Sequence, residues 1–276
     1  MSIAEPRFRA VVLAGERSGG SALTRAAGVA AGVLVPVAGQ AAVERVVDAL
    51  DASVWINDCL LCGPEQSIAE TSDVIQALKA RETLRWMAPA TGPAASAFAA
   101  VESIADYPIL VTAGDHALLS EEILDEFCAA AQLRSEDLII GLVPYELVQR
   151  AFPESRRTVL KFRDGGFCGS NLFAFMKPEA RHALKFWSQV ENDRKRPWRI
   201  ARRLGLWTLI RYLAGQCGID EAFRILSARA GCKIGYLSLK TPTAAVDVDS
   251  VDDWRLAEQI LVERAKNRNA QTSADL

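Results

Sequence analysis

The sequence has few histidines, no long apolar run and no excess of either charge. His116 and His182 are its only histidines, which excludes metal sites built from several imidazoles and leaves a Ser-His-Asp triad two candidates. No apolar run reaches the roughly 18 residues that a membrane-spanning helix needs, and no signal-peptide core precedes the first predicted strand. The 32 Lys and Arg nearly balance the 34 Asp and Glu, which argues against a nucleic-acid coating protein. We therefore expect a cytoplasmic protein.

Paired cysteine motifs are also scarce. The chain has six cysteines, but its one CxxC motif, from Cys59 to Cys62, has no second pair that would complete a zinc knuckle. This motif lies in an apolar run, which favours packing in a strand or loop over metal or redox chemistry.

Short apolar runs alternate with helical patterns through the first 145 residues. This β-α repetition predicts an α/β domain with a mostly parallel, buried sheet and right-handed crossovers. Strands are predicted at 8–14, 53–58, 84–87, 108–113 and 137–144, and helices at 40–50, 65–80, 92–104 and 120–133.

The pattern changes after residue 145. Two strands are predicted within 157–175, strand character returns at 232–248, and Ser250 caps a last helix. We predict one domain over residues 8–266 with a helical subdomain inserted at about 178–231, followed by a polar, disordered tail at 267–276.

Ligands of open parallel sheets bind beyond the carboxyl ends of the strands, so the loops after strands carry the candidate residues. The first loop is rich in glycine from Gly15 to Gly20, and glycines let backbone N–H groups approach a phosphate, for which Arg17 or Arg25 would supply charge. Its spacing fits neither GxGxxG nor GxxxxGK[ST]. A surface loop without ligand is the alternative. A second candidate loop, 91–96, opens a helix.

Acidic residues mark two further loops. Asp115 directly follows an apolar strand and precedes His116, and Asp247 and Asp249 follow the strand predicted near the C-terminus. Carboxylates there suit Mg²⁺, which takes one or two of them together with substrate phosphates. Helix capping is the alternative for Asp247 and Asp249, and a structural role is favoured over a catalytic base for His116.

These loops, in this order, resemble those of the MobA-like NTP transferases, within the wider group of GT-A-type nucleotidyltransferases. The resemblance covers 10–175 and 244–262 and is poor over 178–243. The matching pieces are Val12–Gly15, Leu34–Gln40 leading into Val43–Val46, Val111–Leu119, Cys168–Phe173 and Ala245–Trp254.

The resemblance implies a single Rossmann-like (GT-A-type), three-layer domain that moves an NMP from an NTP to a phosphorylated small-molecule acceptor and releases pyrophosphate. Mg²⁺ is the implied cofactor. The implied residues are Leu13, Ala14, Gly15, Gly92 and Ser96 for the nucleotide, Asp115 and Asp247 for the metal, Gly169 and Asn171 for the acceptor, and Arg17, Arg25 and Asp115 for catalysis.

The sequence departs from the family at two positions of the phosphate loop. Glu16 stands where the family has a second glycine, and Gly32 stands where it has a lysine. Loss of a phosphate-binding cation weakens transition-state stabilisation. A catalytically impaired relative that still binds nucleotide is therefore the alternative function.

Residues 194–211 form a basic segment with seven Arg or Lys, no acidic residue, and interleaved Trp, Leu and Ile. Three interpretations stay open. The segment is an amphipathic helix packed on the domain with extended arginines, a pocket for an anionic acceptor, or a site that docks on an anionic membrane surface in a glycolipid pathway.

Overall fold

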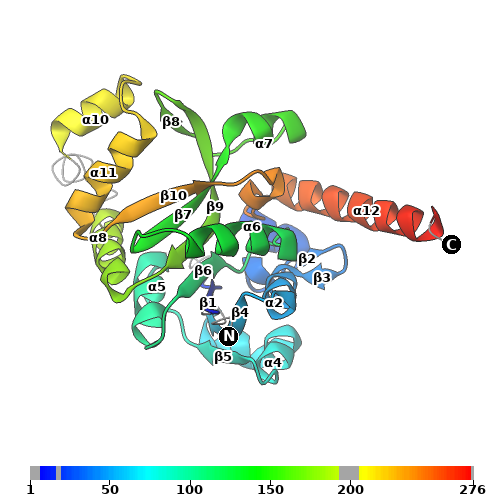
Figure 1. Cartoon of the computed structure of the whole chain (residues 1–276). Coiled ribbons are helices and arrows are strands. Elements are labelled where there is room, and N and C mark those ends of the chain that lie inside the picture. The colour runs from blue at the N-terminus through cyan, green and yellow to red at the C-terminus, as the bar shows by residue number, and fades with distance from the viewer. Residues whose placement is uncertain (1–6, 17–19, 193–204, 275–276) are drawn as a thin grey trace, which may run out of the picture.

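The computed structural model describes residues 7–16, 20–192 and 205–274 of the chain. A central eight-stranded sheet lies between two layers of helices, and the last helix extends away from the body of the domain (Figure 1). The predicted α/β class with a mostly parallel sheet is confirmed.

The strand order of the sheet is β10-β7-β9-β6-β1-β4-β5, with β8 paired to β9. Four neighbouring pairs are parallel, whereas β9 runs antiparallel to β6, β7 and β8. A small hairpin, β2 (Pro36–Val37) with β3 (Gln40–Ala41), lies outside it. The strands of the large sheet are β1 (Phe8–Leu13), β4 (Ile56–Cys62), β5 (Leu84–Met87), β6 (Ile109–Ala113), β7 (Leu138–Pro144), β8 (Leu160–Phe162), β9 (Gly165–Phe175) and β10 (Ile234–Ser238).

Both faces of the sheet are buried, because successive side chains of each strand point to opposite sides. On β1, Phe8 and Val12 pack in the core of one face and Val11 packs in the core of the other. The first face is covered by α2 (Ala42–Ala52), α3 (Gln66–Thr71), α4 (Asp73–Lys79), α6 (Glu121–Gln132) and α7 (Tyr145–Ala151), and the second by α5 (Pro93–Glu102), α8 (Arg181–Asn192) and α11 (Ile219–Ala230).

A third, smaller core joins segments from both ends of the chain. It contains Leu23 of α1 (Ala22–Ala27) and Ala257 of α12 (Val251–Ala274). Val246 and Val248, which lie just before α12, belong to it as well. This packing brings the segment after the 3₁₀ helix η3 (Pro242–Ala245) against the loops that follow β1 and β6.

Two strand predictions were wrong in position. The strand predicted at 53–58 is β4, Ile56–Cys62, because the chain first turns after α2, where the Ser53 N–H donates to the carbonyl of Leu50 at 3.2 Å. The CxxC motif therefore lies in a core strand, and all six cysteines are buried and free. The strand expected to carry Asp247 ends earlier, at Ser238, because Pro242 begins a 3₁₀ helix.

The region predicted as a helical subdomain contains η2 (Pro178–Ala180), α8, α10 (Leu206–Leu213) and α11. Most of the basic segment, its residues 194–204, lies outside the described residues. Helix α12 continues to Ala274, past the end predicted near residue 266. No described helix combines the length and the apolar character that crossing a membrane requires.

Candidate active site

The carboxyl ends of β1 and β6 open into a cleft of about 1650 Å³ on the face of the sheet that α5 and α8 cover. Its floor is the sheet, and its rim is formed by the loops that follow the strands. Of the residues predicted from sequence, the cleft is lined by Leu13, Gly15, Gly92, Ser96, Asp115, Asn171 and Asp247.

The loop after β1 passes directly beneath the cleft. The Gly114 N–H donates to the carbonyl of Leu13 at 2.8 Å, and the Ala14 N–H donates to that of Cys62 at 2.8 Å. These bonds fix the loop between β4 and β6. Gly15 faces the cleft, whereas Ala14 is 1 % exposed and packs in the core.

Glu16 lines the cleft and contacts the first residue of the 3₁₀ helix η1 (Gly32–Leu34). Its Oε2 accepts the N–H of Gly32 at 2.5 Å. A carboxylate therefore accepts the backbone N–H of the residue at which the resemblance leads us to expect a lysine. A Cβ at Gly32 would lie 3.4 Å from the same oxygen.

The second predicted nucleotide loop forms the start of α5. Gly92 is the N-cap, and the buried Ser96 hydroxyl accepts the N–H of Ala90 at 2.9 Å, which shapes the loop before the helix. A residue that the sequence analysis missed also lies here. Glu191 of α8 lines the cleft and accepts the N–H of Ala94 at 3.2 Å, at the positive end of the α5 dipole.

Asp115 lies at the centre of the cleft, directly after β6. Its Oδ1 is buried and has no hydrogen-bond partner among the described residues. Burial, followed by the neighbouring carboxylates of Asp249 and Asp247, raises the pKa of Asp115 to about 8. The Val248 N–H donates to the carbonyl of Asp115 at 3.0 Å, which brings the two acidic segments together.

The Asp247 carboxylate is held from two sides. Its Oδ1 accepts Arg157 Nη1 at 2.7 Å, and its Oδ2 accepts Asn171 Nδ2 at 3.1 Å. Asn171 has a positive φ of 52° and lies beside a register shift between β7 and β9. Such a shift marks a β-bulge, which redirects a side chain. Gly169 is exposed on the same strand, opposite Leu142.

Arg157 is the second residue that sequence reasoning missed. Its side chain is 7 % exposed and bridges Asp247 and Asp253, with Nη2 to Asp253 Oδ1 at 2.6 Å. Its planar guanidinium fits two carboxylates at once. The arginine lies 90 residues before Asp247 in the chain, so no local pattern could have identified it.

His116 is fully buried, and neither ring nitrogen has a hydrogen-bond partner among the described residues. Burial lowers its pKa to about 4, so the imidazole is neutral at physiological pH.

The described lining of the cleft is strongly acidic and carries no Lys, Arg or His. Arg25 is exposed on α1 and does not line it, and Arg17 lies outside the described residues. The six carboxylates of the lining belong to Glu16, Glu65, Asp115, Glu191, Asp247 and Asp249.

The residues around Asp115 fit a divalent cation. The buried Asp115 Oδ1, which has no partner among the described residues, lies near the carboxylates of Asp249 and Asp247, and a cation would neutralise this negative charge. In the described part of the chain, no group of three or more His, Cys, Asp or Glu has the arrangement of a complete metal site. A bound cation would therefore take further ligands from substrate and water.

Solved structures share this fold. A hypothetical transferase from Thermus thermophilus has 28 % identity and a TM-score of 0.73, covering 90 % of this chain and 99 % of its own. The 4-diphosphocytidyl-2C-methyl-D-erythritol synthase of Anaerococcus prevotii has 14 % identity and a TM-score of 0.56, covering 93 % and 99 %. A CMP:2-keto-3-deoxy-manno-octonic acid synthetase in complex with CTP has 9 % identity and a TM-score of 0.57, covering 94 % and 99 %.

No curated protein matches the sequence. Residues 10–161 match the family described as the MobA-like NTP transferase domain. These residues include β1, β6 and the loops that hold Gly15, Glu16 and Asp115, which line the cleft at the carboxyl ends of β1 and β6. The chain belongs to the family of MobA-like NTP transferases.

Proposed function

We propose that the protein is a Mg²⁺-dependent nucleotidyltransferase, which moves an NMP from an NTP to a phosphorylated acceptor and releases pyrophosphate. The observation that carries the proposal is the Asp115 carboxylate, whose buried Oδ1 has no partner among the described residues, beside Asp247 and Asp249 in the cleft that follows β1 and β6. Such a site favours a cation that bridges the protein and the phosphates.

The chain's own residues would mainly position the reactants. The Gly15 loop offers backbone approach to the triphosphate, Asp115 and Asp247 would hold Mg²⁺, and Arg157 and Asn171 keep the Asp247 carboxylate oriented. Mg²⁺ supplies neutralisation of the phosphate charges, which matters in a cleft whose described lining is acidic. The acceptor phosphate is already a nucleophile, so the neutral His116 is not needed as a base.

The test separates binding from chemistry. Titration calorimetry measures binding of each of the four NTPs with and without Mg²⁺, starting with CTP because one solved structure of the same fold holds CTP. Pyrophosphate release is then followed with phosphorylated acceptors. Asp115→Asn is expected to lower the rate at least 100-fold with little change in fold. Absence of NTP binding at millimolar concentration would overturn the proposal.

A specific observation favours a second candidate, a nucleotide-binding relative with impaired catalysis. Glu16 holds the Gly32 N–H and puts a negative charge in the phosphate loop. In this case the wild type binds NTP without turnover, and Gly32→Lys restores pyrophosphate release. Robust wild-type turnover eliminates this candidate.

A further inference from the structure

The part of the cleft beyond Asn171 is apolar on the sheet side and on the helix side. The sheet contributes Ile140, Phe173 and Ile234, and the helices α8 and α11 contribute Trp187 and Leu226. We call these five residues the apolar groove. They contain no charged group and no side-chain hydrogen-bonding group other than the Trp187 indole.

The groove is continuous with the candidate metal site. Asn171 donates to Asp247, and Phe173 follows two residues later on β9, so it lies about 7 Å farther along the same strand. The ring of Phe173 stacks with that of Trp187, with centroids 6.4 Å apart and planes at 24°. A molecule with its phosphate near Asp115 and Asp247 would need a chain several atoms long to reach these rings.

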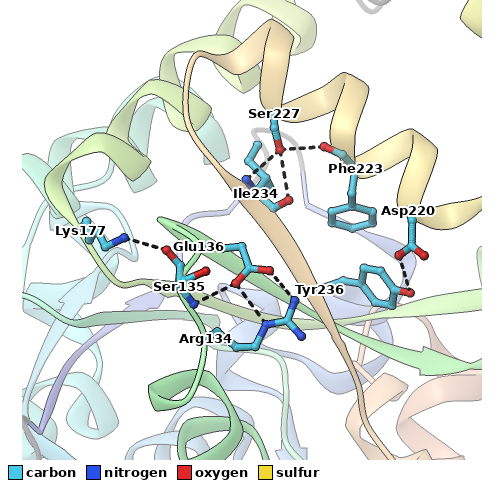
Figure 2. A network of polar contacts seen from close by, with 9 residues as sticks. All are labelled: Arg134, Ser135, Glu136, Lys177, Asp220, Phe223, Ser227, Ile234 and Tyr236. Carbon is cyan, nitrogen blue, oxygen red and sulfur yellow. Dashed lines mark hydrogen bonds and ion pairs between the residues drawn. The ribbon is translucent and has the colours of Figure 1, made fainter.

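Polar contacts join α11 to β10, the two elements that carry Leu226 and Ile234 (Figure 2). The Ser227 hydroxyl of α11 donates to the carbonyl of Phe223 at 2.8 Å and accepts the Ile234 N–H at 2.9 Å. The Tyr236 hydroxyl donates to Asp220 at 3.1 Å. These bonds join α11 to β10, so Leu226 and Ile234 face the groove from two elements tied to each other.

We infer that the acceptor is a phosphomonoester of a hydrocarbon chain, with its phosphate at the metal site and its chain in the apolar groove. This inference rests on the proposed function. A sugar in the groove would find only the Trp187 indole N–H as a side-chain partner for its hydroxyls, whereas a hydrocarbon chain gains from burial. Each buried methylene strengthens binding about three- to fourfold.

The chemical step is a substitution at the α-phosphorus. An oxygen of the acceptor phosphate forms a bond to the α-phosphorus, and the bond from that phosphorus to the pyrophosphate oxygen breaks. The bonding electron pair leaves with pyrophosphate. The product is a diphosphate diester that joins the nucleoside to the hydrocarbon, and no oxidant or reductant takes part.

Binding is tested with decyl phosphate, butyl phosphate and glycerol 3-phosphate, each below its micelle concentration, by calorimetry with Mg²⁺ and without NTP. We expect decyl phosphate to bind at least 100-fold more tightly than either short phosphate. Equal binding of the three, or no binding of decyl phosphate, overturns the inference. Binding to anionic vesicles without binding to monomeric decyl phosphate overturns it too, because the apolar surface then serves membrane docking.

Trp187→Gln tests the groove itself, because Trp187 is 37 % exposed and is not one of the buried core residues. The matched control is Leu133→Gln, at an 85 % exposed position at the end of α6. We expect the first variant to weaken decyl phosphate binding at least tenfold with unchanged MgNTP binding, and the control to bind like wild type. Wild-type affinity for decyl phosphate in Trp187→Gln overturns the inference.

Measurements of turnover distinguish failure of the inferred acceptor class from failure of the proposed nucleotidyltransferase function. Pyrophosphate release with glycerol 3-phosphate or a sugar phosphate but not with decyl phosphate overturns the acceptor class and leaves the nucleotidyltransferase proposal standing. Absence of NTP binding overturns the nucleotidyltransferase proposal, and the binding of decyl phosphate without NTP still decides whether the groove takes a hydrocarbon chain.

Discussion

Stability of the Mg²⁺-free protein should fall as the pH rises from about 6.5 to 8, because of Asp115. Its pKa is raised to about 8 in the fold, from the ordinary value of 3.8 for an aspartate. Over this range the folded protein keeps a proton that the unfolded chain has lost. Stability therefore decreases with pH, as linkage requires when the folded state binds more protons.

The choice of pH range follows from His116. Its pKa is lowered to about 4 in the fold, from 6.5, so its contribution to stability is present above pH 6.5 and is lost as the pH falls toward 4. Between pH 4 and pH 6.5 the gain in stability that His116 gives as the pH rises opposes the loss that Asp115 gives, and the two changes nearly cancel. Above pH 6.5 only Asp115 of this pair acts. One proton over about 1.5 pH units corresponds to roughly 2 kcal/mol.

Urea unfolding at pH 6.5, 7.0, 7.5 and 8.0 in the presence of a chelator measures this loss. Asp115→Asn should remove it, whereas Asp106→Asn should not, because Asp106 is a carboxylate whose side chain is 72 % exposed. Added Mg²⁺ should reverse the trend, since a cation binds the ionised carboxylate. An identical loss of stability in wild type and Asp115→Asn would refute the reasoning.

Three further predictions concern the residues around the cleft. Arg157→Met should lower the free energy of unfolding in urea by about 3 kcal/mol, because it leaves the carboxylates of Asp247 and Asp253 without their buried partner. An unchanged urea midpoint would contradict a stabilising role for Arg157 between these two carboxylates. Glu16→Gln should tighten NTP binding several-fold in calorimetry, because it removes a charge from the phosphate loop and keeps the hydrogen-bond acceptor; weaker binding would contradict the repulsion. Burial raises the pKa of Cys62 to about 11, so iodoacetamide should modify this thiol at least 100-fold more slowly in native than in unfolded protein, as followed by mass spectrometry; equal rates would show that the thiol is accessible.

The sequence was sufficient for the class of fold because local patterns carry it. Alternating apolar runs and helical periods predicted β1, β6 and β7 and the helices α2, α5 and α6, whereas α1 was not predicted and the helix predicted at 65–80 is divided into α3 and α4. The same patterns misplaced β4, because Ser53–Trp55 is apolar enough to look like a strand although it forms a turn. They also extended the strand before Asp247, which in the fold lies in a segment after η3.

The sequence by itself determined the α/β architecture, the family and the position of Asp115 after a buried strand, since each depends on residues near one another in the chain. Only the tertiary structure decided which groups surround that carboxylate. Arg157 reaches Asp247 across 90 residues, and Glu191 reaches Ala94 across 97. Such contacts depend on how the layers pack, and the apolar groove beside them is made from five residues of distant elements that share no local pattern.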